Sequence, residues 1–155
     1  MASGCAGTRS TTVTTTSAPT ACAVPPPTHA PELAVAGSFL DALAAGDYPR
    51  MANALAPAAR LQALVPRGLR EWSGADEICA AFASWFGDAN QLQMLDIDAG
   101  AVGPRLHMHW RIRMSAARLG TGWFVVEQHA YAETDSSRAI SELRLLCSGY
   151  CPELS

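Results

Sequence analysis

The chain has 155 residues, 49% of them hydrophobic, and a formal net charge of −3. This length and apolar content are enough for one packed core. All eleven basic residues are Arg and no basic stripe is present, which excludes lysine-nucleophile chemistry and argues against a nucleic-acid partner. No apolar stretch reaches the roughly 18 residues that a membrane span needs. The five cysteines form no paired framework, which predicts reduced thiols in a cytoplasm, and the Arg-only, Ala-rich composition is typical of a bacterial genome rich in GC.

Residues 1–31 differ in composition from the rest of the chain. Thr, Ser, Ala and Pro dominate, including the runs Thr14–Thr16 and Pro25–Pro27. Such a segment buries too little apolar surface to offset the entropy lost on ordering, so we expect a disordered tail. It also lacks the apolar run of a secretory signal. The folded domain is expected over residues 32–155.

Three helices are predicted at the start of this domain. A first apolar stripe begins after Pro31 and ends at Gly46, and Asp47 is a suitable cap for a second helix in which Met51 and Leu55 are a turn apart. A short strand, Leu61–Val65, and a loop, residues 67–72, precede the third helix, which ends at Gly87. The residues spaced for one helical face are Leu33, Ala36, Phe39, Leu40 and Leu43 in the first helix and Ile78, Phe82, Trp85 and Phe86 in the third.

Beyond residue 87 the spacing of apolar residues changes from that of a helix to every second residue, which is the spacing of a strand. Strands are predicted over 92–97, 105–114, 122–133 and 139–149, joined by turns rich in Gly, Ser and Asp. Helices followed by a strand meander indicate an α+β domain with a curved, mainly antiparallel sheet.

The segment Arg105–Met114 alternates sharply between apolar and polar residues. Its apolar set must face the helices: Leu106, Met108, Trp110, Ile112 and Met114. The opposite set, which contains His107, His109 and three arginines, is best interpreted as a solvated outer face. An anion or partner surface is the alternative. Two histidines two residues apart also offer metal ligands, but no third ligand follows at a recognisable spacing, so no metal and no cofactor is expected.

The next strand has no clearly polar face. One face carries Trp123, Val125, Glu127, His129 and Tyr131, and the other carries Phe124, Val126, Gln128, Ala130 and Ala132. If the first set faces the helices, a carboxylate and an imidazole enter an apolar interior, where desolvation suits both to proton transfer near neutral pH. The alternative places them at the rim of the sheet, paired with each other or with water. The last strand directs Leu145 and Cys147 inward.

The chain resembles the nuclear-transport-factor-2-like superfamily in its SnoaL-like bacterial branch. The resemblance rests on the order of the elements and on the runs Phe39–Asp47, Ser73–Ile78, Val125–His129 and Leu143–Gly149. It implies a cone-shaped barrel, a curved sheet wrapped around about three helices, with a hydrophobic pocket. The superfamily includes isomerases, epoxide hydrolases, polyketide cyclases and non-catalytic modules, so the fold does not define the activity.

The resemblance places Glu127 at the buried acid of the steroid isomerases and so implies that its face points inward. The Tyr and base positions of that mechanism fall on Phe39 and Val65, which argues against it. The acids of the epoxide hydrolases are also missing, since the matching positions are Arg113 and Leu145. Glu127 with His129 remains compatible with a rearranged form of the Asp and His on which polyketide cyclases depend.

We therefore predict a pocket for a small, largely apolar molecule, with Glu127 and His129 as candidate catalytic groups for isomerase or cyclase chemistry. Whether the protein is an enzyme is left open. The alternative is a non-catalytic module whose pocket is filled by side chains and which forms a homodimer through the outer sheet face. The predicted lining is Phe39, Trp72, Phe82, Trp85, Phe86, Trp110, Ile112, Met114, Trp123, Val125, Leu145 and Cys147.

Overall fold

The computed structural model describes residues 30–154. The disorder predicted for the tail therefore concerns residues that lie almost entirely outside the described part of the chain. Within that part, no helix is long and apolar enough to cross a membrane.

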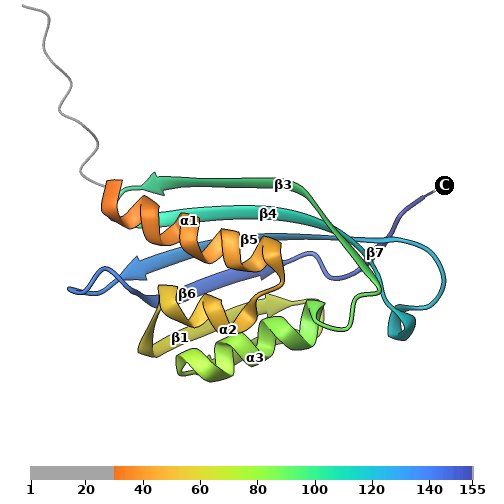
Figure 1. Cartoon of the computed structure of the whole chain (residues 1–155), viewed down its shortest axis with the longest axis horizontal. Helices are drawn as coiled ribbons and strands as arrows, with labels where there is room; N and C mark the ends of the chain where they lie inside the picture. The colour runs from red at the N-terminus through yellow and green to blue at the C-terminus, as the bar shows by residue number, and fades with distance from the viewer. Residues whose placement is uncertain (1–29, 155) are drawn as a thin grey trace, which may run out of the picture.

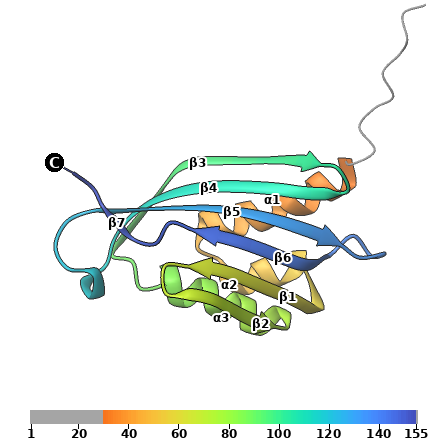
Figure 2. The same ribbon diagram turned by 180° about the vertical axis from the view of Figure 1, so that it is seen from behind.

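Helices and a curled sheet form two layers, with the helices on one face of the sheet (Figures 1 and 2). The helices are α1 (Ala30–Ala45), α2 (Tyr48–Met51) and α3 (Ala75–Phe86), with short 3-10 turns η1 (Ala52–Ala54) and η2 (Ala117–Leu119). The strands are β1 (Leu55–Val65), β2 (Gly68–Ser73), β3 (Gln91–Val102), β4 (Arg105–Ser115), β5 (Phe124–Thr134), β6 (Ile140–Cys147) and β7 (Cys151–Pro152).

The strand order is β2-β1-β6-β5-β4-β3, and β7 pairs with β5. Every described pairing is antiparallel except that of β1 with β6. Because the order has two ends, the sheet is curled but open, with β2 and β3 as its edges. The predicted α+β class, with a curved and mainly antiparallel sheet around three helices, is confirmed.

Two local predictions at the start of the domain are wrong. Residues 68–72 belong to strand β2 and not to a loop, because a tight turn at residues 66–67, followed by Gly68 at φ 110°, folds the chain back onto β1. An edge strand is paired on one side only, and this one is largely exposed. Its apolar residues therefore alternate weakly, and the sequence pattern does not predict it. The second helix stops at Met51, and Leu55 begins β1. Asp47 caps that helix as predicted, since its carboxylate accepts from the Arg50 amide at 3.0 Å.

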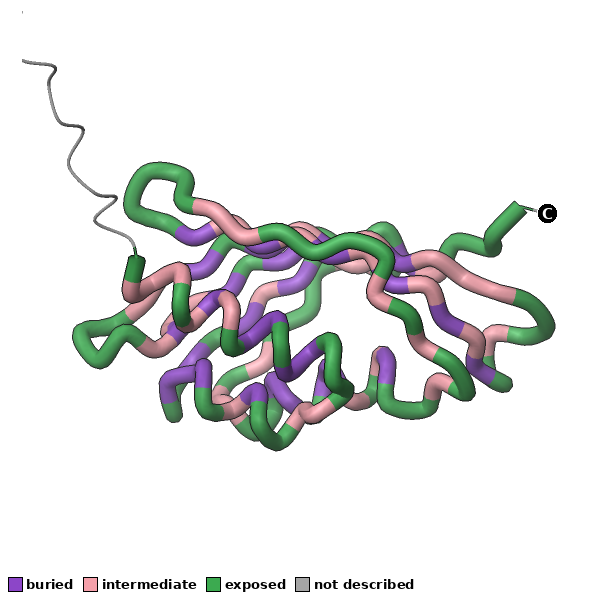
Figure 3. The backbone as a smooth tube through the Cα atoms, turned by 45° about the horizontal axis from the view of Figure 1, so that its top comes forward, coloured by how far each residue is buried: buried purple, intermediate pink, exposed green. Residues whose placement is uncertain are grey.

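The core lies where the helices face the sheet, and buried positions recur along the strands there (Figure 3). The predicted inner face of β4 is confirmed, because each of its five apolar side chains is at most 3% exposed. Phe39, Phe82 and Trp110 form an aromatic cluster with ring centroids 5.5–6.2 Å apart. This cluster fills the middle of the cone.

Replacing Trp110 by Ala should cost about 3–5 kcal/mol of unfolding free energy, because a fully buried indole leaves a cavity among two other rings. Urea unfolding followed by circular dichroism measures the loss. Leu146→Ala is the control, because Leu146 lies on the outer face of β6 and is 53% exposed. It should change the unfolding free energy by about 0.5 kcal/mol. Similar losses for both variants would contradict the assigned faces.

Candidate functional site

The face of β5 that points to the helices is the one that carries Gln128. Val126, Gln128, Ala130 and Ala132 are at most 1% exposed, whereas Glu127 and the residues at alternate positions from it lie outside. Pairing with β4 sets this choice, because Gln128 lies opposite the buried Trp110 and residues directly opposite on two strands share a face.

The prediction that Glu127 and His129 face the interior is therefore wrong. Burying a carboxylate and an imidazole costs more free energy than burying one amide that has a hydrogen-bond partner. The register with Gln128 inside therefore has the lower free energy. The same register moves Trp123 and Val125 to the outer surface. There the Arg113 guanidinium lies 4.0 Å above the Trp123 ring. Glu127 and His129 cannot act on a molecule held on the helix side of the sheet.

The other predicted pocket residues divide between a filled core and an open cleft. Trp85, Phe86 and Cys147 line the cleft, and Trp72 packs edge-on against Trp85 with ring centroids 5.4 Å apart. The remaining six are buried and fill the cone instead of lining a cavity: Phe39, Phe82, Trp110, Ile112, Met114 and Leu145.

The cleft has a volume of about 800 Å³. The residues that line it belong to segments distant in sequence. These segments converge at the end of the sheet near β7 (Figure 1). Its walls come from the β1–β2 turn, the last turn of α3, η2, the first half of β5 and residues 147–150. Sequence reasoning missed Phe124, Val126 and Gln128 because they belong to the face of β5 that was predicted to point outward.

Gln128 is the one fully buried polar side chain among residues 30–154, and it lines the cleft. Its Oε1 accepts a hydrogen bond from the Trp110 indole Nε1 at 2.7 Å. The indole N–H is a donor only, so this bond fixes the orientation of the amide. The Gln128 Nε2 group, which donates to no described residue, is therefore a donor of fixed orientation in the lining of the cleft.

Arg118 and Tyr150 line the cleft and are held by several polar contacts. The Arg118 guanidinium donates to Asp88 at 2.7 Å and to the Trp85 carbonyl at 2.6 Å. It also stacks on the Tyr150 ring, whose hydroxyl donates to the same carbonyl at 2.8 Å. Burial raises the pKa of the Tyr150 hydroxyl, which keeps it protonated as a donor. These contacts tie η2, α3 and the C-terminal segment together.

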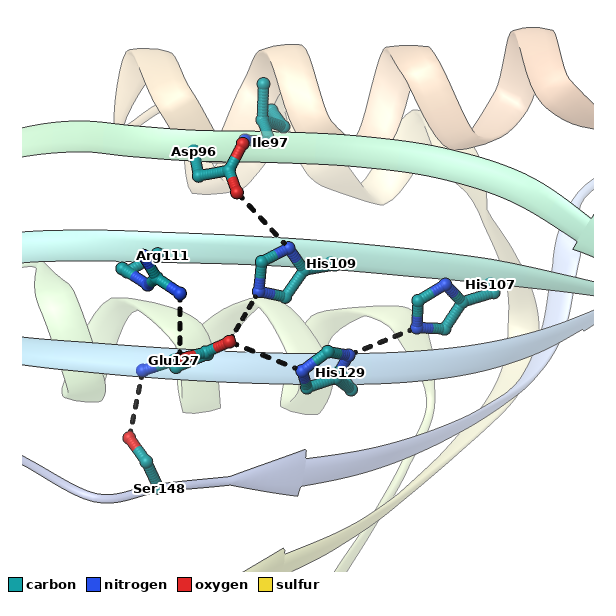
Figure 4. Close-up of polar contacts among 8 residues, drawn as sticks. All are labelled: Asp96, Ile97, His107, His109, Arg111, Glu127, His129 and Ser148. Atoms are coloured by element: carbon teal, nitrogen blue, oxygen red, sulfur yellow. Dashed lines mark hydrogen bonds and ion pairs between the residues drawn. The ribbon is translucent and has the colours of Figure 1, made fainter.

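A second group of polar side chains lies on the outer face of the sheet, away from the cleft (Figure 4). The Glu127 carboxylate accepts from His109 at 2.9 Å and from Arg111 at 3.3 Å, and these two hydrogen bonds hold its pKa below the usual range. The His109 and His129 rings stack with centroids 4.4 Å apart. His107 approaches His129 from the other side, and desolvation together with the neighbouring imidazoles lowers the pKa of His107.

Comparisons with known proteins identify the fold. No protein-family model and no curated protein matches the sequence. Among solved structures, a candidate polyketide cyclase from Xanthomonas campestris pv. campestris matches at 17% identity with a TM-score of 0.59, covering 75% of this chain and 89% of that one. A candidate SnoaL-like polyketide cyclase from Shewanella putrefaciens matches at 14% identity with a TM-score of 0.60, covering 75% and 88%.

An NTF2-like protein of unknown function from Cytophaga hutchinsonii matches at 13% identity with a TM-score of 0.54, covering 76% of this chain and 89% of that one. An open α+β cone with helices on its concave side is the architecture that these proteins share. The chain thus has the nuclear-transport-factor-2-like fold, and SnoaL-like proteins are among those with the same architecture. At these identities the likeness concerns the fold and leaves the activity open.

The hydrogen bond between Trp110 and Gln128 should appear as an energetic coupling. Trp110→Phe leaves a buried oxygen without a donor, and Gln128→Met leaves a buried N–H without an acceptor, so each should cost about 1–3 kcal/mol. The double variant should cost less than the sum, with a coupling of about 1 kcal/mol measured by urea unfolding. Additive losses would show that the two groups do not interact.

Proposed function

We propose that the cleft binds a small, largely apolar molecule that presents an oxygen acceptor to the Gln128 amide. The observation that carries this proposal is the orientation of Gln128. The Gln128 Nε2 group has no partner among the described residues and borders the cleft, where a ligand oxygen can replace water as its acceptor. A carbonyl group on the ligand meets this requirement best. Its oxygen accepts hydrogen bonds, and it carries no hydrogen that would meet the amide N–H.

The composition of the lining supports the same class of ligand. The lining combines polar groups with a continuous set of apolar and aromatic residues: Val65, Trp85, Phe86, Leu119, Phe124 and Val126. A concave, mainly apolar surface with a few fixed polar groups is what small-molecule sites have in common, and 800 Å³ lies within their usual range. Two proteins that share the fold carry the name polyketide cyclase, and an oxygenated, largely apolar compound of that kind suits this lining.

The proposal is one of binding and not of acid–base catalysis. Within residues 30–154, the groups of the lining that ionise are two arginines, a tyrosine and a cysteine, and the carboxylate predicted for proton transfer lies across the sheet. The alternative prediction of a pocket filled by side chains is compatible with the inner part of the cone, which buried side chains occupy. Homodimerisation through the outer face and a cytoplasmic location stay predictions.

The proposal is tested with the neutral dye Nile red, which is apolar and carries a carbonyl oxygen. Cys147→Trp should fill the cleft and weaken dye binding at least tenfold in a fluorescence titration of the full chain. Leu146→Trp is the matched control, because the same residue is introduced one position away on the opposite face of β6. It should bind the dye as the wild type does. Equal binding by both variants would place the dye outside the cleft and overturn the proposal.

A further inference from the structure

Two imidazoles and one carboxylate converge on the outer face of the sheet. His109 comes from β4, and Glu127 and His129 come from β5 (Figure 4). His109 and His129 are direct cross-strand partners and therefore share a face, and Glu127 reaches the same face two residues before His129. One ligand atom from each of the three side chains lies within 4.8 Å of the other two.

Two of the three distances between the ligand atoms are close to those in a zinc site. The Glu127 Oε1 atom lies 2.9 Å from His109 Nε2 and 3.5 Å from His129 Nε2. Tetrahedral bonds of about 2.0–2.1 Å to zinc separate neighbouring ligand atoms by about 3.3 Å. The side chain of His129 is 41% exposed, so an ion can reach its ring from solvent.

A further residue lies on the far side of each ligand. His109 Nδ1 lies 3.8 Å from the Asp96 carboxylate on β3, and His129 Nδ1 lies 3.2 Å from His107 Nε2. The Arg111 guanidinium engages the second oxygen of Glu127 and leaves Oε1 to face the histidines. Metal-binding histidines usually have their other ring nitrogen hydrogen-bonded, because that contact fixes the ring orientation and the tautomer. His129 has such a contact, and the Asp96 carboxylate lies at ion-pair distance from His109.

We propose that His109 Nε2, His129 Nε2 and Glu127 Oε1 bind a divalent transition-metal ion, for which Zn²⁺ is the natural probe. Two imidazoles with one carboxylate form a known three-ligand zinc set that leaves a position for water or for a further ligand. The ion would join β4 to β5 on the face opposite the cleft, so the site is independent of the proposed binding function. The positive charge of Arg111 opposes a cation here, which points to moderate affinity.

Zinc binding by the full-length chain is measured by equilibrium dialysis against Zn²⁺, with thermal unfolding as a second readout. We expect one ion per chain and a rise in melting temperature with Zn²⁺ concentration, because an ion that binds only the folded state stabilises it. His109→Ala and His129→Ala should each weaken binding at least tenfold and remove the thermal effect. The melting temperature of each variant without metal shows that it is folded.

Two controls separate this site from other zinc ligands of the chain. His29→Ala removes a histidine that lies outside the described residues and should leave the affinity unchanged. Replacing Cys147 and Cys151 together by Ser removes the neighbouring thiols and should also leave it unchanged. Co²⁺ should give an absorption spectrum without a thiolate charge-transfer band. No binding at millimolar Zn²⁺, full binding by both histidine variants, or binding lost with the cysteines would each overturn the proposal.

Discussion

The pairing of β4 with β5 is the constraint on which the other features of this protein depend. It sets Trp110 opposite Gln128 inside the cone and His109 opposite His129 outside it. The first pair makes a buried hydrogen bond that orients an amide into the cleft, and the second brings two imidazoles into stacking contact. A shift of one residue would exchange the two faces of β5, placing Glu127 and His129 in the core and Gln128 in solvent.

Desolvation explains why this register is the stable one. Among residues 30–154 the interior accepts a single polar side chain, because the indole N–H satisfies its oxygen and the cleft leaves its nitrogen accessible. The charged and titratable groups of β5 then lie on the outer surface, where they form ion pairs with β4 and keep contact with water. One strand thus provides two chemically distinct surfaces, an apolar wall with one amide and a polar cluster rich in imidazole.

The arrangement also shows why the fold says little about the activity. The deep part of the cone, where a ligand would be sought by analogy, is occupied by Phe39, Phe82 and Trp110. The open space lies nearer the end of the sheet and is bounded by η2, the last turn of α3 and the C-terminal segment. Small differences in core size and in these connecting segments decide where a shared architecture leaves room for a ligand.

The sequence by itself determined the first and third helices, the α+β class and the inner face of β4, because each depends on apolar periodicity within a single segment. It also placed Trp85, Phe86 and Cys147 on the helix side, where they line the cleft. The edge strand β2 was not predicted. It has one hydrogen-bonded neighbour and an exposed surface, so its apolar and polar residues show little alternation. Only the tertiary structure decided which face of β5 is buried and which side chains meet across strands. Alternation shows which residues share a face, but the choice of face and of partners depends on the energy of packing and desolvation against the neighbouring strand.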